Sequence, residues 1–293
     1  MTLAKDQPAI SVVMVSYYTG PVLFEAIASV LAQTAPLELM LVDNGNPPHV
    51  AATLRAMAAR DSRIRYLSGH GNAGFSKGCN IGARAARGTQ LLFLNPDGVM
   101  PPGILACLAD YAARLPSPFM LGARLIDEQG RDQRGCRRAL LTPISAFIEA
   151  FHLGRLFPRL RLNRHEEAVP TALTPMPAIS GAFMFLTQAD FWRINGFDED
   201  YFLHVDDLDF CLRFRRAGGE IYFAPDIIVM HVCSTSQASV ALIERHKARG
   251  FSQYFHKNFA TQYSPLFLWL LDLAIWLRQE WRIGLAAWRS AWN

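Results

Sequence analysis

Residues 8–115 alternate between short apolar segments and longer segments with helical periodicity, and this alternation restricts the fold more than any other feature. The apolar segments span 10–16, 37–42, 64–67 and 90–94. Apolar residues recur at helical spacing over 22–33, 49–59, 75–86 and 102–114. Strands that alternate with helices of this length form βαβ units around a parallel sheet. We therefore predict an α/β fold with a mostly parallel sheet flanked by helices.

Polar residues follow three of these strands, at Ser16-Tyr17, Asp43-Asn44 and 95–97. Ligands of open parallel sheets bind beyond the carboxyl ends of the strands, so we expect these loops to line one crevice. The glycine-containing run 72–82 opens the following helix, where backbone amides favour anions. It is neither a Walker A loop nor a dinucleotide fingerprint, because the required glycine and lysine spacings are missing.

The second half of the chain is less regular. We predict strands at 119–126, 178–187, 221–223 and 227–231, and helices at 144–157, 188–194, 207–217, 238–259 and 265–290. The segment 131–175 is rich in Arg and Pro and has weak periodicity. It is interpreted as a long excursion from the sheet.

Composition excludes several classes of protein. A net charge of +4 gives no reason to expect a nucleic-acid partner. The five cysteines are scattered without a CxxC pair, so neither a zinc site nor a disulfide framework is expected. We expect the thiols to be reduced, as in the cytoplasm. The N-terminus lacks the apolar core of a signal peptide. No apolar run reaches the ~20 residues that a membrane-spanning helix needs.

Three acids, Asp206, Asp207 and Asp209, lie between an apolar-aromatic segment and an Arg-rich helical run. Carboxylates this close repel one another, and burial adds to the effect, so a raised pKa on at least one of them is expected. A raised pKa of this kind is one way to make a catalytic base. The alternative is that the three acids cap a helix and complement its dipole.

Six motifs in a fixed order resemble the family 2 glycosyltransferases, which are inverting enzymes of the GT-A fold. The motifs are VVMVSY (12–17), LVDNG (41–45), GNAGFSKGCNIG (71–82), LNPDG (94–98), SGAFM (180–184) and VDDLDFCLR (205–213). The resemblance covers roughly residues 8–235, and the Asn-Pro-Asp form is most similar to the rhamnosyltransferase-like branch. It implies a catalytic domain over 1–235, with a donor half at about 8–115 and an acceptor half at about 116–235. A helical segment over 236–293 follows.

The resemblance also implies roles for individual residues. Asp207 takes the position of the general base, with Asp206 and Asp209 as accompanying acids. Asp97 takes the last position of the family's metal motif, and His231 falls where a further metal contact is often placed, which implies Mg²⁺ or Mn²⁺. The nucleotide-sugar site is implied for nine positions: Ser16, Tyr17, Asp43, Asn72, Gly74, Phe75, Asn80, Asn95 and Asp97.

Three of these residues also have purely structural explanations. Asp43 is also explained as a turn-capping residue, and His231 as a structural residue at a strand end. Asn95 replaces the first acid of the metal motif, so a single carboxylate remains there. Asp209 has the i,i+4 spacing for an ion pair with Arg213.

The tail combines apolar and aromatic residues with Arg278, Arg282 and Arg289, a pattern of helices that lie at a membrane interface. Packing on the domain or in a homodimer explains it equally well. We expect a cytoplasmic enzyme, peripheral on the inner membrane, that moves a sugar from a dTDP- or UDP-sugar to a glycan or lipid-linked acceptor in polysaccharide synthesis. The alternatives are a non-catalytic scaffold on this fold and a sugar nucleotidyltransferase; the latter lacks its glycine-rich signature after the first strand.

Overall fold

The computed structural model describes residues 8–150, 156–157, 161–232 and 239–291. Its centre is a mixed sheet in the order β3-β2-β1-β4-β10-β6-β11-β5, with β8 paired to β11. The strands are β1 Ile10–Ser16, β2 Leu37–Asp43, β3 Ile64–Leu67, β4 Gln90–Leu94, β5 Gly98–Val99, β6 Phe119–Ile126, β8 Thr174–Pro175, β10 Phe183–Thr187 and β11 Glu220–His231. A small second sheet pairs β7 (Arg137–Arg138) with β9 (Ala178–Ile179).

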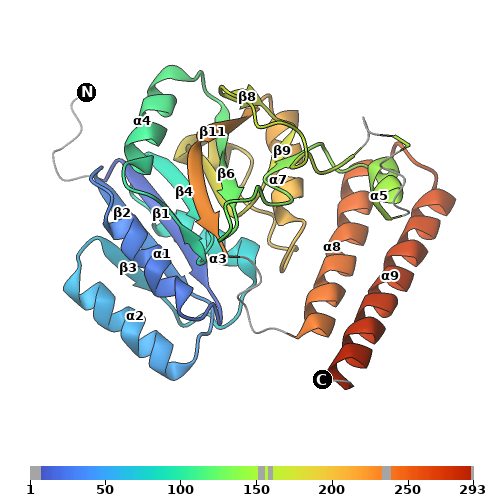
Figure 1. Cartoon of the computed structure of the whole chain (residues 1–293), viewed down its shortest axis with the longest axis horizontal. Coiled ribbons are helices and arrows are strands. Elements are labelled where there is room, and N and C mark those ends of the chain that lie inside the picture. Colours follow the sequence, from blue (N-terminus) through green and yellow to red (C-terminus); the bar gives the residue numbers. More distant parts are fainter. Residues whose placement is uncertain (1–7, 151–155, 158–160, 233–238, 292–293) are drawn as a thin grey trace.

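Helices cover both faces of the sheet, and two long C-terminal helices lie side by side at one end of the molecule (Figure 1). The helices are α1 Val22–Leu31, α2 Pro48–Arg60, α3 Phe75–Ala85, α4 Ile104–Arg114, α5 Pro143–Ala150, α6 Gln188–Arg193, α7 Asp206–Arg216, α8 Val240–Phe259 and α9 Pro265–Ala291. Strands β3, β2, β1 and β4 are parallel, as the alternating pattern predicts. β10 enters antiparallel between β4 and β6.

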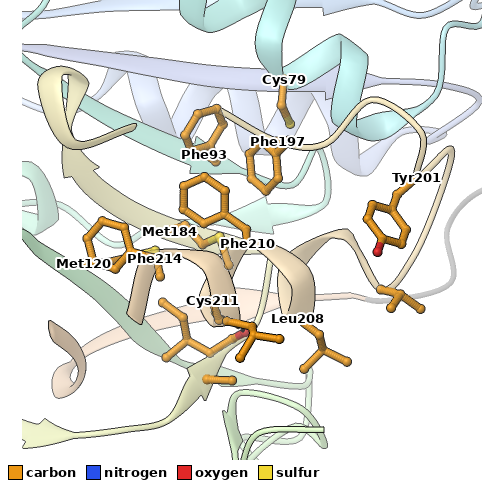
Figure 2. Packing of buried hydrophobic residues seen from close by; sticks show 14 of the residues in the cluster. Cys79, Phe93, Met120, Met184, Phe197, Tyr201, Leu208, Phe210, Cys211 and Phe214 are labelled. Carbon is orange, nitrogen blue, oxygen red and sulfur yellow. Dashed lines mark hydrogen bonds between the residues drawn. The ribbon is translucent and has the colours of Figure 1, made fainter. Parts of the chain in front are cut away.

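The sheet separates two apolar cores. One lies under α1 and α4, and the other lies under α3, α6, α7 and α8. Aromatic rings fill the second core, where Phe93, Phe197 and Phe210 pack in edge-to-face and tilted pairs near the buried Cys79 and Met184 (Figure 2). α7 is therefore fixed against the sheet by its apolar face, which leaves its acidic N-terminus at the sheet edge.

Three sequence predictions differ from the structure. The apolar run 178–187 forms two strands rather than one, because residues 180–182 turn between β9 and β10. The strands predicted at 221–223 and 227–231 are one strand, β11, with an irregularity between Ala224 and Ile228 where Pro225 lies. The helix predicted at 144–157 begins at Pro143 and is described only to Ala150; several of its later residues lie outside the described ranges.

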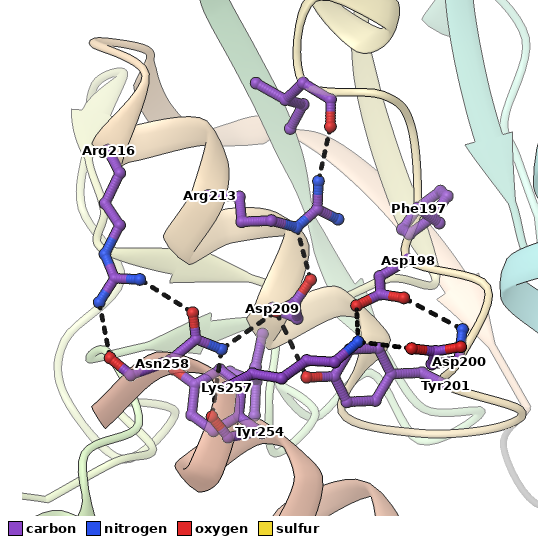
Figure 3. A network of polar contacts seen from close by, with 12 residues as sticks. Phe197, Asp198, Asp200, Tyr201, Asp209, Arg213, Arg216, Tyr254, Lys257 and Asn258 are labelled. Carbon is purple, nitrogen blue, oxygen red and sulfur yellow. Dashed lines mark hydrogen bonds and ion pairs between the residues drawn. The ribbon is translucent and has the colours of Figure 1, made fainter. Parts of the chain in front are cut away.

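The C-terminal helices pack on the domain and share its core. Tyr254, Phe255 and Phe259 of α8 and Leu268 and Leu271 of α9 belong to the same buried cluster as the sheet residues. Polar contacts add to this packing (Figure 3). Lys257 of α8 pairs with Asp198 and Asp200 at 2.6 and 2.7 Å. α8 is thus joined to the loop that precedes α7.

Candidate active site

The end of β2 forms a compact polar turn around Asp43, which is 5% exposed. Its Oδ1 accepts from the amides of Gly45 and Asn46 at 3.0 and 2.8 Å and from the Asn46 side chain at 2.9 Å. Its Oδ2 accepts from the hydroxyl of Tyr66. Burial raises the pKa of Asp43, but these hydrogen bonds outweigh burial and lower it. Asp43 is thus an anion that both caps the turn and presents a carboxylate at the sheet edge.

Ser16 and Tyr17 lie beside this turn at the end of β1. Ser16 is in register with Asp43, and its backbone oxygen and Oγ accept from the Asn46 side chain at 3.1 and 2.9 Å. Tyr17 packs edge-on against Tyr18, with ring centroids 4.8 Å apart. The structure therefore brings together Ser16, Tyr17 and Asp43, three of the nine residues predicted for the nucleotide-sugar site.

The loop before α3 is fastened to the same turn by Asn44. Its Nδ2 donates to Asn72 Oδ1 at 3.2 Å and to the carbonyl of Gly74 at 3.0 Å. Gly74 has φ 86° and ψ 169°, a region that is essentially restricted to glycine. The amide of Phe75 donates to the carbonyl of Phe202 at 2.7 Å. The predicted donor loop is thus tied to the segment that leads into α7.

Asn80 lies away from this edge. It is 1% exposed, and its Nδ2 donates to the carbonyl of Phe197 at 2.8 Å and to Glu199 at 3.0 Å. Its Oδ1 accepts from the amide of Phe197 at 3.0 Å. The structure therefore gives Asn80 the role of fixing the 197–199 loop, and a nucleotide contact stays a prediction without support from its surroundings.

The 95–97 loop meets the end of β11. β5 pairs with β11 at Gly98 and His231, which places Asp97 Oδ1 3.1 Å from His231 Nε2. Asn95 Nδ2 lies 3.1 Å from the same nitrogen. Gln133 donates to the His231 carbonyl, so its Oε1 faces His231 Nδ1, at 2.7 Å. Because Oε1 only accepts, Nδ1 carries a hydrogen, and in the neutral ring the lone pair of Nε2 accepts from Asn95 Nδ2.

This pair fits a divalent cation. Two ligands about 2.1 Å from a metal and at right angles to one another lie about 3 Å apart, which matches the distance between Asp97 Oδ1 and His231 Nε2. Metal-bound imidazoles usually donate their other N–H to an acceptor, as His231 does to Gln133. Within the described residues, no three His, Cys, Asp or Glu side chains cluster as a metal site. The protein would therefore supply two ligands, and substrate oxygens and water the others.

Asp207 lies at the first turn of α7 in a set of donors. Its Oδ2 pairs with Arg138 and accepts from the amide of Gly181 at 3.0 Å, and its Oδ1 accepts from Leu208 at 2.8 Å. Burial raises the pKa of Asp207, but the Arg138 guanidinium and these hydrogen bonds outweigh it and lower the pKa. Asp207 is therefore a carboxylate at neutral pH, and Oδ1 has a second lone pair for an acceptor hydroxyl.

The neighbouring acids differ from Asp207. Burial and the Asp207 carboxylate raise the pKa of Asp206 to about 8. The raised pKa expected in this cluster therefore falls on Asp206 and not on Asp207, the acid predicted as the base, because Arg138 contacts Asp207. Asp209 forms the predicted ion pair with Arg213, at 2.6 Å, and also accepts from Asn258 of α8 at 3.2 Å. Asp209 thus serves to anchor α7.

The turn between β9 and β10, residues 180–182, connects Asp207 to the 95–97 loop. Gly181 donates to Asp207, and the carbonyl of Ala182 accepts from the amide of Asn95 at 2.9 Å. A Cβ at Gly181 would lie 3.0 Å from Asp207 Cβ, so a larger residue there would press on the carboxylate. One three-residue turn therefore sets the position of both groups.

The backbone entering α7 is strained. His204 and Val205 have φ 65° and 68°, a conformation that is a marked outlier for a β-branched residue. Gly250 of α8 packs against them, since a Cβ there would lie 3.3 Å from Val205 Cγ2. Strain of this kind persists only where the surroundings enforce it, and it is frequent at functional sites.

Four residues at this edge were not predicted as site residues: Asn46, Tyr66, Gln133 and Arg138. Asn46 lies in the same turn as Asp43, so the sequence of that turn could have indicated it as a site residue. Arg138 belongs to a run of four arginines, and their charges gave no hint which one would face an acid; the run is Arg131, Arg134, Arg137 and Arg138. Tyr66 and Gln133 reach the site only through tertiary contacts and carry no local signal.

The family match and the fold together identify the protein as a glycosyltransferase. Residues 11–181 match the model of the family described as Glycosyl transferase family 2, and the chain belongs to this family. It is 27% identical over 276 residues to the N-acetylglucosaminyl-diphospho-decaprenol L-rhamnosyltransferase of Mycobacterium tuberculosis, covering 89% of this chain and 83% of the relative. It is 28% identical over 185 residues to rhamnosyltransferase WbbL of Escherichia coli, covering 61% of this chain and 67% of WbbL.

Solved structures show the fold. A mannosyltransferase from Pyrobaculum calidifontis in complex with GDP-Man and Mn²⁺ superimposes with a TM-score of 0.59 at 17% identity, covering 97% of this chain and 74% of that one. GalNAc-T7 with UDP, GalNAc and Mn²⁺ gives 0.60 at 17% identity, with 89% and 52% covered. These similarities confirm the GT-A fold predicted from the motifs.

Proposed function

We propose that this enzyme transfers a sugar, L-rhamnose, from a nucleoside-diphosphate donor to a hydroxyl of a lipid-linked saccharide, with inversion. The observation that carries the proposal is the position of Asp207, an ionised carboxylate joined by the 180–182 turn to the loop of Asn95 and Asp97. Both relatives are rhamnosyltransferases, which suggests rhamnose, and the acceptor of the mycobacterial relative suggests a lipid-linked diphosphate.

Each group has a distinct task in this proposal. Asp43 accepts the ring N–H of a uracil or thymine base, beside Ser16 and Tyr17. Asp97 and His231 would hold Mg²⁺ or Mn²⁺, and the cation would supply charge stabilisation for the departing diphosphate. Asp207 Oδ1 takes the proton of the acceptor hydroxyl as that oxygen attacks the anomeric carbon from the side opposite the leaving group. A well-placed base of this kind contributes about 10²–10⁴-fold.

The experiment is a transfer assay with dTDP-rhamnose and a lipid-linked N-acetylglucosamine diphosphate acceptor, on the wild type and Asp207→Asn. The variant should lose transfer by about 10²–10⁴-fold while donor-induced thermal stabilisation stays within a degree or so of wild type. Asp110→Asn, on an outer helix, is the control. Unchanged transfer by Asp207→Asn would show that another residue is the base. If the wild type does not transfer rhamnose from dTDP-rhamnose, the same assay is repeated with UDP-sugars.

We further propose that the exposed face of α9 binds the membrane that carries the acceptor, with 236–293 as its attachment segment. Eight large apolar side chains of α9 are between 38% and 68% exposed: Leu266, Trp269, Leu270, Leu273, Trp276, Leu277, Trp281 and Trp288. Monomeric proteins rarely expose so continuous an apolar surface. Arg278 and Arg289 flank it and complement anionic lipids. No described helix is long and apolar enough to cross a membrane.

The membrane proposal is tested by co-sedimentation with phosphatidylglycerol–phosphatidylcholine vesicles. The double variant Trp281→Ser/Trp288→Ser should bind at least about tenfold more weakly, since burial of a large apolar side chain contributes about 1.5–3 kcal/mol. Trp192→Phe, away from α9, is the matched control. Wild-type binding by the double variant would refute the proposal, and a concentration-dependent dimer that the variant abolishes would assign the face to a second copy.

A further inference from the structure

Arg138 differs from the other three arginines of residues 131–138 in the acid that it contacts. The other three arginines of the run pair with Asp127, Glu149 and Asp132. Arg138 instead extends from β7 to the first turn of α7, where its Nη2 contacts both Asp207 Oδ2 and the carbonyl of Ile179, the latter at 2.6 Å. Its side chain is 11% exposed. This contact fixes the guanidinium beside one carboxylate of an adjacent pair.

Two neighbouring buried carboxylates cannot both ionise without a compensating cation. Asp206 and Asp207 are adjacent in α7, and their side chains are almost enclosed. Arg138 contacts Asp207 directly, whereas no described hydrogen bond or ion pair joins it to Asp206. The charge is therefore assigned to Asp207 and the proton to Asp206.

We propose that Arg138 is a positioning residue that makes Asp207, and not Asp206, the base for the acceptor hydroxyl. The inference rests on the proposed transfer reaction. Arg138 touches no reacting atom in this scheme, since Asp207 Oδ1 receives the acceptor proton while Oδ2 stays paired with Arg138 and Gly181. The guanidinium also helps to orient the carboxylate, together with the amides of Gly181 and Leu208.

Other titratable groups around the pair do not replace Arg138. Burial and Lys247 lower the pKa of His204 to about 4, so the ring is neutral at pH 7 and offers Asp207 no charge. Burial raises the pKa of Cys211 to about 12 and raises that of Cys79 beside Asp206, so both thiols are neutral. Asp209 is engaged by Arg213. Among the described residues, Arg138 is the cation in direct contact with Asp207.

The experiment is the pH profile of transfer for the wild type, Arg138→Gln and Arg138→Lys. An adjacent Arg lowers a carboxylate pKa by about 1–3 units, so the acid limb of kcat should move up by that amount in Arg138→Gln. Donor KM should not change. Arg138→Lys, which keeps the charge, should recover part of the shift. Arg134→Gln, which breaks the exposed pair with Glu149, is the matched control. An unmoved acid limb in a folded Arg138→Gln overturns the proposal.

A second measurement needs neither transfer nor a variant at Arg138. In wild-type protein labelled with ¹³C at the aspartate carboxyl, the Asp206 resonance should titrate with a midpoint of about 8, and that of Asp207 should stay constant between about pH 5 and 9. Asp206→Asn and Asp207→Asn assign the two signals. The reverse order overturns the inference. If the protein transfers no sugar yet the titration has this order, the proposed reaction fails and the assignment of charge stands.

Discussion

Gly74 is the position where a single methyl group should reveal how the donor loop depends on the segment before α7. A Cβ at Gly74 would lie 2.7 Å from the carbonyl oxygen of Phe202 and 2.9 Å from its ring. That oxygen accepts the amide of Phe75 at 2.7 Å. Gly74→Ala therefore adds backbone strain of about 1–3 kcal/mol and weakens a hydrogen bond of about 0.5–1.5 kcal/mol. The free energy of unfolding should fall by about 2–4 kcal/mol.

Gly71 provides a control in the same loop. It also has a positive φ, 64°, but a Cβ there would meet nothing within 4 Å. Gly71→Ala should cost only the left-handed strain, about 1–2 kcal/mol. Urea unfolding gives both stabilities, and thermal shift with dTDP or UDP and Mn²⁺ gives donor binding, which Gly74→Ala should weaken more. Equal stability and equal donor affinity of the two variants would refute the claim that the Phe202 contact shapes the donor loop.

Three further predictions concern individual contacts. Asp97→Asn should abolish the metal-dependent part of donor stabilisation in a thermal-shift assay and leave the metal-free part unchanged. Tyr66→Phe removes a hydrogen-bond donor to Asp43 and should lower the free energy of unfolding by about 1.5–3 kcal/mol at pH 7. Because the folded pKa of Asp43 is depressed, this difference between variant and wild type should shrink as the pH falls below about 4. Urea unfolding at a series of pH values measures it. Arg137→Met, at a 1% exposed residue paired with Asp132, should cost about 3–5 kcal/mol in the same assay.

Local sequence predicts the donor half well because its signals are local. Each buried strand is a short apolar run, each helix has a 3.6-residue pattern, and the loop that follows each strand must lie at one edge of a parallel sheet. Ser16, Asp43 and Asp97 therefore lie at the sheet edge where the order of strands required them. The pair of Asp209 with Arg213 was predictable for the same reason, since four residues on a helix are neighbours in space.

The acceptor half was less predictable because its structure depends on contacts between distant residues. The turn at 180–182 interrupts a largely apolar run at Ser180-Gly181, and hydrogen bonds join this turn to Asp207 and Asn95. Pro225 suggested a break between two strands, but the pairing with β6 continues on both sides of it, so β11 is a single strand. Arg138 was one of four similar arginines, and only the fold shows that it faces Asp207. Asn80 resembled a ligand contact in sequence, but its partner is the backbone of Phe197.

The segment beyond residue 235 is better understood through α8 than through its composition. On one side, α8 packs against α9, whose outer face we propose to bind lipid. On the other side, His246 stacks on Phe202 with ring centroids 4.3 Å apart, and Gly250 supports the strained Val205 just before the acids. Since Phe202 also accepts the amide of Phe75, one helix connects the outer face, the acids and the donor loop. The helix that packs beneath the proposed membrane-binding face of α9 thus also supports the backbone that leads into the acids.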